Sequence, residues 1–170
     1  PRALRGAEAE SPKMSHLVDT HCHLDPQYWP EGHEAVLARA AAAGVSSFVA
    51  IGVGETLEPA RHVVRIAGAR ADVWATVGLH PHDAKVLTDE MRSELAALAD
   101  LPRVVAIGEI GLDYHYLHSP REQQVAVFRE LIDLAVEKQK PIVIHTREAA
   151  EETLSILEQS RAREVGGIIH

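Results

Sequence analysis

Apolar and polar positions follow one another along this chain in a pattern that predicts strands and helices in turn. Short apolar runs bounded by glycine, proline or polar residues are typical of buried strands, whereas apolar residues three or four positions apart are typical of amphipathic helices. The apolar runs predict six strands: Leu17-Val18 running into His21-Cys22-His23, Ser47–Val53, Val73–Gly78, Val104–Glu109, Pro141–His145 and Gly167–His170.

Helical spacing fills the intervals between these runs. The predicted helices are Glu34–Ala43, Leu57–Ala67, Asp89–Ala99, a segment from Pro120 to about Lys138, and Glu148–Gln159. We expect Gly44 and Gly68 to end the first two, because glycine is common just after a helix. Ser119-Pro120-Arg121-Glu122 matches a capping box with proline at the first helical position, and it predicts the start of the fourth helix.

Strict alternation of strand and helix indicates an α/β fold with a parallel sheet covered on its faces. Two architectures fit this order, the open doubly wound sheet and the (β/α)8 barrel, and both place sites at the carboxyl ends of strands. No Gly-x-Gly-x-x-Gly follows the first predicted strand, which weakens the case for a dinucleotide fold. Residues 1–13 lack periodicity and predict a disordered N-terminal tail, which leaves residues 14–170 as one domain.

Composition narrows the classes of function. Hydrophobic residues make up 46% and charged residues 25%, as in ordinary globular proteins. The net charge of -8 argues against a broad basic surface for nucleic acid, although bound cations can supply local positive charge for a phosphate-bearing substrate. A single cysteine, Cys22, fits a reducing compartment, and no apolar run is long enough to cross a membrane. We therefore expect a cytoplasmic protein without a membrane partner.

Histidines gather where the predicted strands end. His21 and His23 are two residues apart, so in an extended strand their imidazoles point to the same side while Cys22 faces away. Of the 11 histidines, eight lie at or just beyond a predicted strand end: His21, His23, His80, His82, His115, His118, His145 and His170. Glu109 ends the fourth predicted strand between two glycines and can approach two metal ions. This gathering predicts a metal site on the catalytic rim of a barrel.

Four stretches, in order and spacing, resemble the TatD family of metal-dependent deoxyribonucleases, within the amidohydrolase superfamily of barrels. They are Asp19-Thr20-His21-Cys22-His23-Leu24-Asp25, Gly78-Leu79-His80-Pro81-His82, Ile107-Gly108-Glu109-Ile110-Gly111-Leu112-Asp113-Tyr114 and Pro141-Ile142-Val143-Ile144-His145-Thr146-Arg147. The resemblance implies a TIM-type (β/α)8 barrel. Because such barrels run to about 250 residues, we expect this chain to be truncated after the sixth strand, without the family's eighth-strand aspartate.

The resemblance also implies roles for particular residues. His21 and His23 resemble ligands of a first metal, Glu109 the catalytic carboxylate that bridges two metals, and His145 and His170 ligands of the second. The implied cofactors are two divalent ions (Zn, Mn or Mg), and the implied reaction is hydrolysis of DNA phosphodiester bonds by an activated water. The remaining candidates contact substrate or orient ligands: His80 and His82 as pocket residues, Asp113 as the partner of a histidine, and Arg147 as a phosphate contact or an ion-pair partner of Glu148 or Glu151.

Two alternatives remain open from the sequence. Another metallohydrolase, acting on phosphomonoester or amide bonds, is one, because histidinol-phosphatase-like barrels also begin with His-x-His. A non-catalytic, metal-binding fragment is the other. The stretch from Gly108 to Tyr114 favours the nuclease. Uncovered edge strands predict self-association, and the absent aspartate predicts weak activity.

Overall fold

The computed structural model describes residues 16–170, so the predicted tail at residues 1–13 lies outside the described residues. Within the described part, six parallel strands form one sheet in the order of the sequence. The strands are β1 (Leu17–Cys22), β2 (Val45–Gly52), β3 (Val73–Val77), β4 (Val104–Asp113), β5 (Ile142–Arg147) and β6 (Gly167–Ile169).

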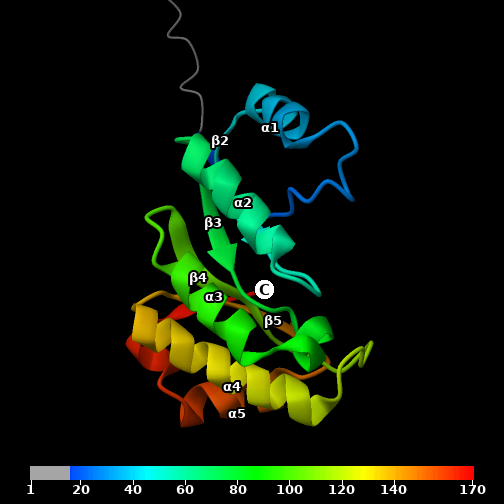
Figure 1. Ribbon diagram of the computed structural model, residues 1–170, viewed down its shortest axis with the longest axis vertical. Coiled ribbons are helices and arrows are strands. Elements are labelled where there is room, and N and C mark those ends of the chain that lie inside the picture. Colours follow the sequence, from blue (N-terminus) through cyan, green and yellow to red (C-terminus); the bar gives the residue numbers. More distant parts are fainter. Residues whose placement is uncertain (1–15) are drawn as a thin grey trace, which may run out of the picture.

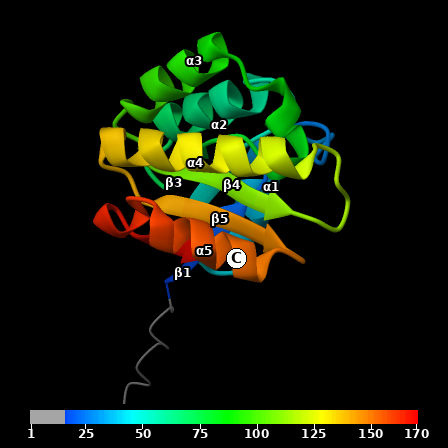
Figure 2. The same ribbon diagram turned by 90° about the horizontal axis from the view of Figure 1, so that it is seen from below.

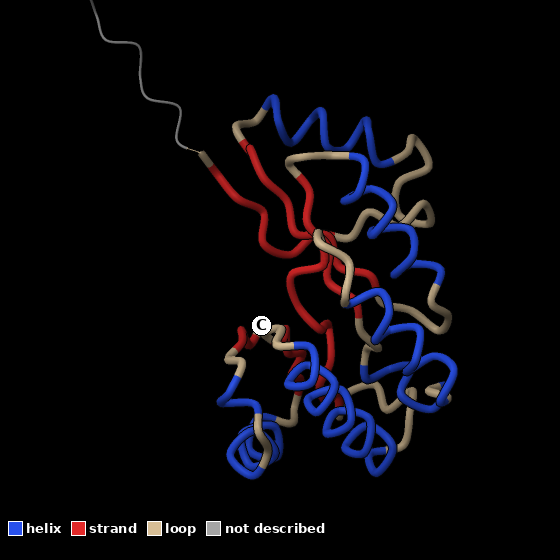
Figure 3. The backbone as a smooth tube through the Cα atoms, turned by 60° about the vertical axis from the view of Figure 1, so that its left-hand side comes forward, coloured by secondary structure: helices blue, strands red, loops and turns tan. Residues whose placement is uncertain are grey.

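Helices connect these strands and cover the outer side of the sheet. Figure 3 shows the strands as an inner layer and the helices as an arc outside them, and Figure 2 shows α2, α3 and α4 side by side over the strands. The helices are α1 (His33–Ala42), α2 (Glu58–Ala69), α3 (Asp89–Ala99), α4 (Arg121–Lys138) and α5 (Ala150–Gln159), with short 3-10 turns η1 (Pro81–Val86) and η2 (Ala162–Glu164). In the part of the chain that the structure describes, no helix is both long and apolar enough to cross a membrane.

The strand order distinguishes between the two architectures that the sequence allowed. Each strand pairs with its neighbours in sequence and the order never reverses, whereas a doubly wound sheet needs a reversal. In a flat sheet, β1 and β6 would lie about 24 Å apart. Here the ring of His21, in β1, lies 3.9 Å from the ring of His170, just after β6. The sheet therefore curls as in a barrel, so the barrel prediction is confirmed.

The core is centred on β4, which lies behind α3 and α4 in Figure 1. Nine of the ten β4 residues are buried, and on α4 the side chains of Phe128, Leu131 and Ile132 are fully buried against the sheet. A strand buried on both faces reads as a nearly continuous apolar run, which explains why the sequence pattern located it. The packing holds β4 firmly, and with it any side chain that β4 presents to the inside of the curl.

Two predicted helix boundaries are wrong. Gly68 does not end the second helix but lies inside α2, and the chain becomes extended only at Arg70. Ser119 does not cap the fourth helix: Pro120 takes the N-cap position without a side-chain hydrogen bond, and the Ser119 hydroxyl instead donates to the carbonyl oxygen of His82 at 2.7 Å. The tertiary contact with the β3–α3 connection thus replaces the local cap.

The fourth strand is longer than the sequence predicts. It continues past Glu109 to Asp113, pairing with β5 as far as Arg147. Glu109 therefore lies within the strand, and Asp113 is the residue at its carboxyl end. The two carboxylates are four residues apart on one rigid element, which fixes their separation across the site.

Candidate metal centre

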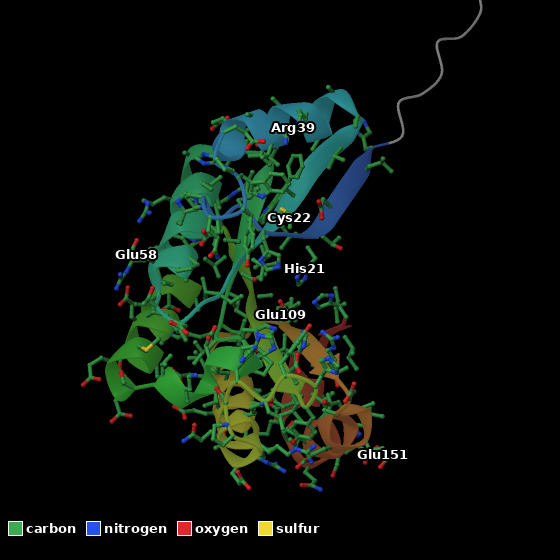
Figure 4. All side chains as sticks on the ribbon, turned by 90° about the vertical axis from the view of Figure 1, so that its right-hand side faces the viewer. His21, Cys22, Arg39, Glu58, Glu109 and Glu151 are labelled. Carbon is green, nitrogen blue, oxygen red and sulfur yellow. The ribbon has the colours of Figure 1, made fainter. Side chains whose placement is uncertain are left out.

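The carboxylate of Glu109 lies at the centre of the histidine cluster. Its residue is only 3% exposed. Figure 4 shows Glu109 near His21, where the upper and lower parts of the curled sheet meet. Four imidazoles contact or approach this carboxylate: His170 Nε2 at 2.7 Å and His145 Nδ1 at 3.0 Å from Oε1, His21 Nε2 at 3.4 Å from Oε2, and His80 Nε2 at 4.0 Å from Oε1.

These side chains form two groups with the spacing of a metal site. His21, His23 and Glu109 offer donor atoms within 4.8 Å of one another, and so do His80, Glu109 and His145. Glu109 belongs to both groups, as a carboxylate shared between two cations would. His170 contacts the same carboxylate, although among the described residues it does not complete either group of three. The second group contains His80, which the sequence proposed only as a pocket residue.

The donor set fits a divalent cation on electrostatic grounds. Burial would raise the pKa of Glu109, but hydrogen bonds with His145, His21 and His170 outweigh burial and hold the pKa below its usual value. Burial lowers the pKa of His80 to about 3, and burial with the nearby His21 lowers that of His23. A charged carboxylate and the neutral imidazoles of His80 and His23 are donors that zinc, manganese and similar ions prefer. Within residues 16–170, Glu109 forms no ion pair with a lysine or arginine, so no such side chain neutralises its charge in place of a metal ion.

A second buried carboxylate, Asp113, supports the site from behind. Its Oδ2 lies 2.9 Å from His82 Nε2 and 3.1 Å from His145 Nε2. Burial would raise the pKa of Asp113, but the backbone hydrogen bond from Tyr116 and the contacts with His82 and His145 hold it well below its usual value. A charged Asp113 favours a proton on His145 Nε2, which leaves Nδ1 free to act as a ligand on the Glu109 side.

Gln124 on α4 holds Asp113 in place. This glutamine is fully buried; its Oε1 accepts from the Asp113 backbone N–H at 2.8 Å and its Nε2 donates to the Asp113 carbonyl at 2.9 Å. Gln124 is not among the site residues predicted from the sequence, because a glutamine in a helix normally indicates a solvent-exposed face. The sequence signal for its burial is its spacing of three and four residues from the buried Val127 and Phe128 of α4.

A cavity of about 970 Å³ opens above the cluster. Seven of the residues proposed from the sequence line it: His21, His23, His80, His82, Glu109, His145 and His170. Asp113 lies beneath the cavity rather than on its wall, and Arg147 lies to one side, with its Cζ 4.7 Å from the centre of the Tyr116 ring. The predicted alternative for Arg147, an ion pair with Glu148 or Glu151, is not among the ion pairs of residues 16–170.

The cavity wall also contains residues that the sequence did not predict, and three of them are polar residues near the strand ends. Glu55 follows β2, Asp83 follows β3 within η1, and Tyr28 lies in the β1–α1 connection. The rule that located the histidines, polar groups just beyond strand ends, applies to Glu55 and Asp83 as well. Burial raises the pKa of Asp83, and nearby Glu55 adds to the increase. The wall of the cavity is therefore acidic on this side.

A curled parallel β/α sheet with imidazoles and carboxylates converging at its carboxyl edge is the architecture of the metal-binding barrels. Comparison with known proteins identifies the group within that class. The family model described as TatD related DNase matches residues 18–170, and the chain belongs to this family.

Its relatives include both uncharacterised hydrolases and a nuclease. The chain is 39% identical over 155 residues to an uncharacterized metal-dependent hydrolase, YabD, of Bacillus subtilis, covering 91% of this chain and 60% of that protein. It is 34% identical over 154 residues to a 3'-5' ssDNA/RNA exonuclease, TatD, of Enterobacter lignolyticus, covering 91% of this chain and 58% of that protein. The chain therefore spans less than two thirds of the length of these relatives.

Solved structures agree with the fold. The crystal structure of YJJV, a TatD homologue from Escherichia coli, superimposes with a TM-score of 0.77 at 29% identity over 86% of this chain and 56% of that chain. A TatD family hydrolase from Entamoeba histolytica gives the same TM-score at 25% identity over 91% of this chain and 57% of that chain. The barrel-type arrangement of the six strands is thus that of TatD homologues.

We expect the double variant His21→Ala/His23→Ala to lose most of its bound divalent metal. Both imidazoles belong to the same donor group as Glu109, and two ligands are removed at once. Elemental analysis after equilibration with Zn²⁺ or Mn²⁺ and gel filtration measures the result. The matched control is His33→Ala/His62→Ala, a histidine pair with ring centres 5.5 Å apart on α1 and α2, away from Glu109. Equal metal content in the two double variants would contradict the assignment.

Proposed function

We propose that this protein is a divalent-metal-dependent hydrolase that cleaves phosphodiester bonds of DNA. The observation that carries the proposal is the buried carboxylate of Glu109 shared by two groups of metal-type donors. The relative named as a 3'-5' ssDNA/RNA exonuclease supports a nucleic-acid substrate. The single cysteine supports action in the cytoplasm, a reducing compartment.

The proposed roles follow from the positions of the side chains. His21 and His23 would hold one ion with Glu109, and His145 would hold a second with Glu109, with His170 as the further ligand that the family resemblance implies. Divalent ions there supply Lewis acidity, which activates water and offsets charge on a phosphate. The cavity wall carries Glu55 and Asp83, so bound cations would also reduce the repulsion of a polyanion.

Four residues would act on the substrate or through other side chains. His80 and His82 line the cavity, with ring centres 4.3 Å apart. His80 Nδ1 accepts from the backbone N–H of His82, so His80 Nε2 would donate to a phosphate oxygen, whereas His82 Nε2 is already paired with Asp113. Asp113 would act through His145 and His82 rather than on the substrate. Arg147 would bind a phosphate farther along the strand, since it lies outside the cavity wall.

Paired hydrolysis assays test this function. The chain is incubated with Mn²⁺, Zn²⁺ or Mg²⁺ and a labelled single-stranded oligonucleotide, and in parallel with a phosphomonoester and an amide substrate. Cleavage of the oligonucleotide alone, abolished by EDTA, supports the proposal. Metal-dependent turnover of the phosphomonoester or the amide alone would replace it with another hydrolase. Metal binding without any turnover would indicate a non-catalytic chain.

We also propose that the chain self-associates through its sheet edges. In the described structure β1 and β6 each pair on one side only, and their side chains Leu17, Val18, Ile168 and Ile169 are about half exposed or more. Unpaired strands with exposed apolar residues favour edge-to-edge pairing. We expect Ile169→Lys to shift light-scattering mass toward the monomer, while Leu101→Lys, at an exposed site outside the edge strands, leaves it unchanged. A monomeric unmodified chain at high concentration would contradict this proposal.

A further inference from the structure

An exposed aromatic side chain lies beside the metal centre. Tyr116, in the β4–α4 connection, is 51% exposed, and the neighbouring Leu117 is 47% exposed. The cavity lining does not include Tyr116, and the proposed reaction does not use it. Large exposed side chains on a connection at the catalytic edge of a barrel point to a contact with a ligand.

Tyr116 is the centre of a stack of flat groups. The guanidinium carbon of Arg147 lies 4.7 Å from the centre of the tyrosine ring. The ring of His118 is nearly parallel to it, at 11° and 5.5 Å, and the ring of His115 is edge-on at 4.6 Å. We call Tyr116, His118 and Arg147 the rim stack. It combines planar π surfaces with a permanent positive charge at the edge of a protein whose net charge is -8.

The rim stack adjoins the metal centre. The ring of His82 lies 5.6 Å from that of Tyr116 and 4.7 Å from that of His118, while its other neighbours are His80 at 4.3 Å and the carboxylate of Asp113. One imidazole therefore separates the rim stack from the residues around Glu109. A polymer that runs from the metal centre past His82 would reach the rim stack.

Hydrogen bonds fix the rim stack even though it is exposed. Asp113 Oδ1 accepts from the backbone N–H groups of Tyr116 and His115, each at 3.0 Å. His115 Nδ1 lies 2.7 Å from a carboxylate oxygen of Glu148, and Lys85 Nζ donates to the carbonyl of His118 at 3.0 Å. The same buried carboxylate thus positions the histidines of the metal centre and the backbone of the rim stack.

Backbone strain is concentrated in the same two connections. Among the described residues, three that are not glycine have positive φ, and two of them are Leu117 at 49° and Glu148 at 52°, adjacent to Tyr116 and Arg147. The third, Gln139, ends α4. Non-glycine residues in this region carry a cost that surrounding contacts must offset, and such strain is typical of ligand sites. Here the two strained residues lie next to the exposed ring of Tyr116 and next to Arg147.

We propose that the rim stack binds a base of a single-stranded nucleic acid next to the phosphate at the metal centre. The base would stack on the exposed π surface, and Arg147 would stack with it or bind the adjoining phosphate. Every base has a π face, so the contact selects for an unpaired base rather than a particular sequence, and it disfavours duplexes. This inference rests on the proposed function for its choice of substrate.

A binding experiment that does not depend on cleavage tests the rim stack. Fluorescence anisotropy compares a labelled oligothymidylate with an abasic oligonucleotide of the same length, in EDTA and again with Mn²⁺ on phosphorothioate-linked strands. We expect the unmodified chain to bind the base-containing strand about tenfold more tightly. Tyr116→Ala should remove this preference, and Tyr116→Phe should keep it because the ring remains.

Arg147→Ala and Arg129→Ala each remove one positive charge, but only Arg147 belongs to the rim stack. Arg129 is an exposed arginine on α4 that contacts Gln159. The pair of variants therefore distinguishes a contact at the rim stack from a general effect of charge on binding. We expect only Arg147→Ala to weaken binding. Circular dichroism melts verify that the variants remain folded. Equal affinity of the unmodified chain for both strands, no measurable binding of either, or an unchanged preference in Tyr116→Ala would overturn the rim-stack proposal. Hydrolysis without base preference would leave the proposed function standing, and base preference without hydrolysis would leave only the rim stack standing.

Discussion

Glu109→Gln is expected to reduce divalent-metal affinity and any metal-dependent hydrolysis by more than about 100-fold, because even residues that only support metal ligands cost 10- to 100-fold. Glutamine keeps the shape of the side chain but removes the charge at the point shared by both donor groups. Because Glu109 is buried, the loss of its charge is only weakly compensated by solvent. Titration calorimetry with Mn²⁺ and initial rates on a single-stranded oligonucleotide measure the two effects.

Arg147→Ala is the comparison for this variant. It removes one charged contact outside the cavity wall, so we expect about a tenfold loss in rate and no change in metal affinity. The contrast between the two variants is the informative quantity. Similar, mild losses of rate for both, with metal binding retained in Glu109→Gln, would show that Glu109 is not shared between metal ions.

The second large effect is expected on stability. Gly111 lies in β4 with φ at 143°, a backbone conformation that L side chains rarely adopt, and a Cβ added there would overlap the backbone carbonyl of His145 in β5. We expect Gly111→Ala to lower the free energy of unfolding by about 3 kcal/mol or more, because neither backbone can move away within the sheet. Thermal and urea denaturation measure the change.

Gly68→Ala provides a control with the opposite sign. Gly68 lies inside α2, and nothing is within 4 Å of the place where its Cβ would be. Alanine favours the helix, so we expect a gain of about 0.5 kcal/mol. A Gly111→Ala variant as stable as Gly68→Ala would mean that β4 and β5 do not approach each other as the structure has them.

The sequence predicted the elements wherever local and long-range signals agree. The predicted bounds of α3 are those observed, because Thr88 accepts from the N–H of Met91 at 3.2 Å and so provides a true local cap. At Ser119 the local pattern looked similar, but its hydroxyl is used by a distant segment. Gly68 resembles a helix end in the sequence because glycine commonly follows a helix. The sequence does not show that Ile66 and Ala67 are buried and that the helix continues past them.

The sequence predicted those residues of the candidate site that lie at the ends of strands. His21, His23, Glu109 and His145 stand at places where a parallel sheet gathers polar groups, and the structure brings them together. Gln124 and the stack around Tyr116 depend on which loop folds against which helix, and no spacing in the chain carries that information. His170 was also named from the sequence, and the curl of the sheet brings its ring against that of His21.

That contact between the rings of His21 and His170 has a consequence for how the protein folds. The two residues lie near opposite ends of the described chain, so closing the site requires the largest loss of chain entropy of any contact in it. A cation bound at this site would link the two ends of the described chain. Its binding energy adds to folding in proportion to the logarithm of its concentration, about 2.7 kcal/mol at 100 times the dissociation constant. The availability of metal would then govern how often the sheet opens as well as the chemistry within it.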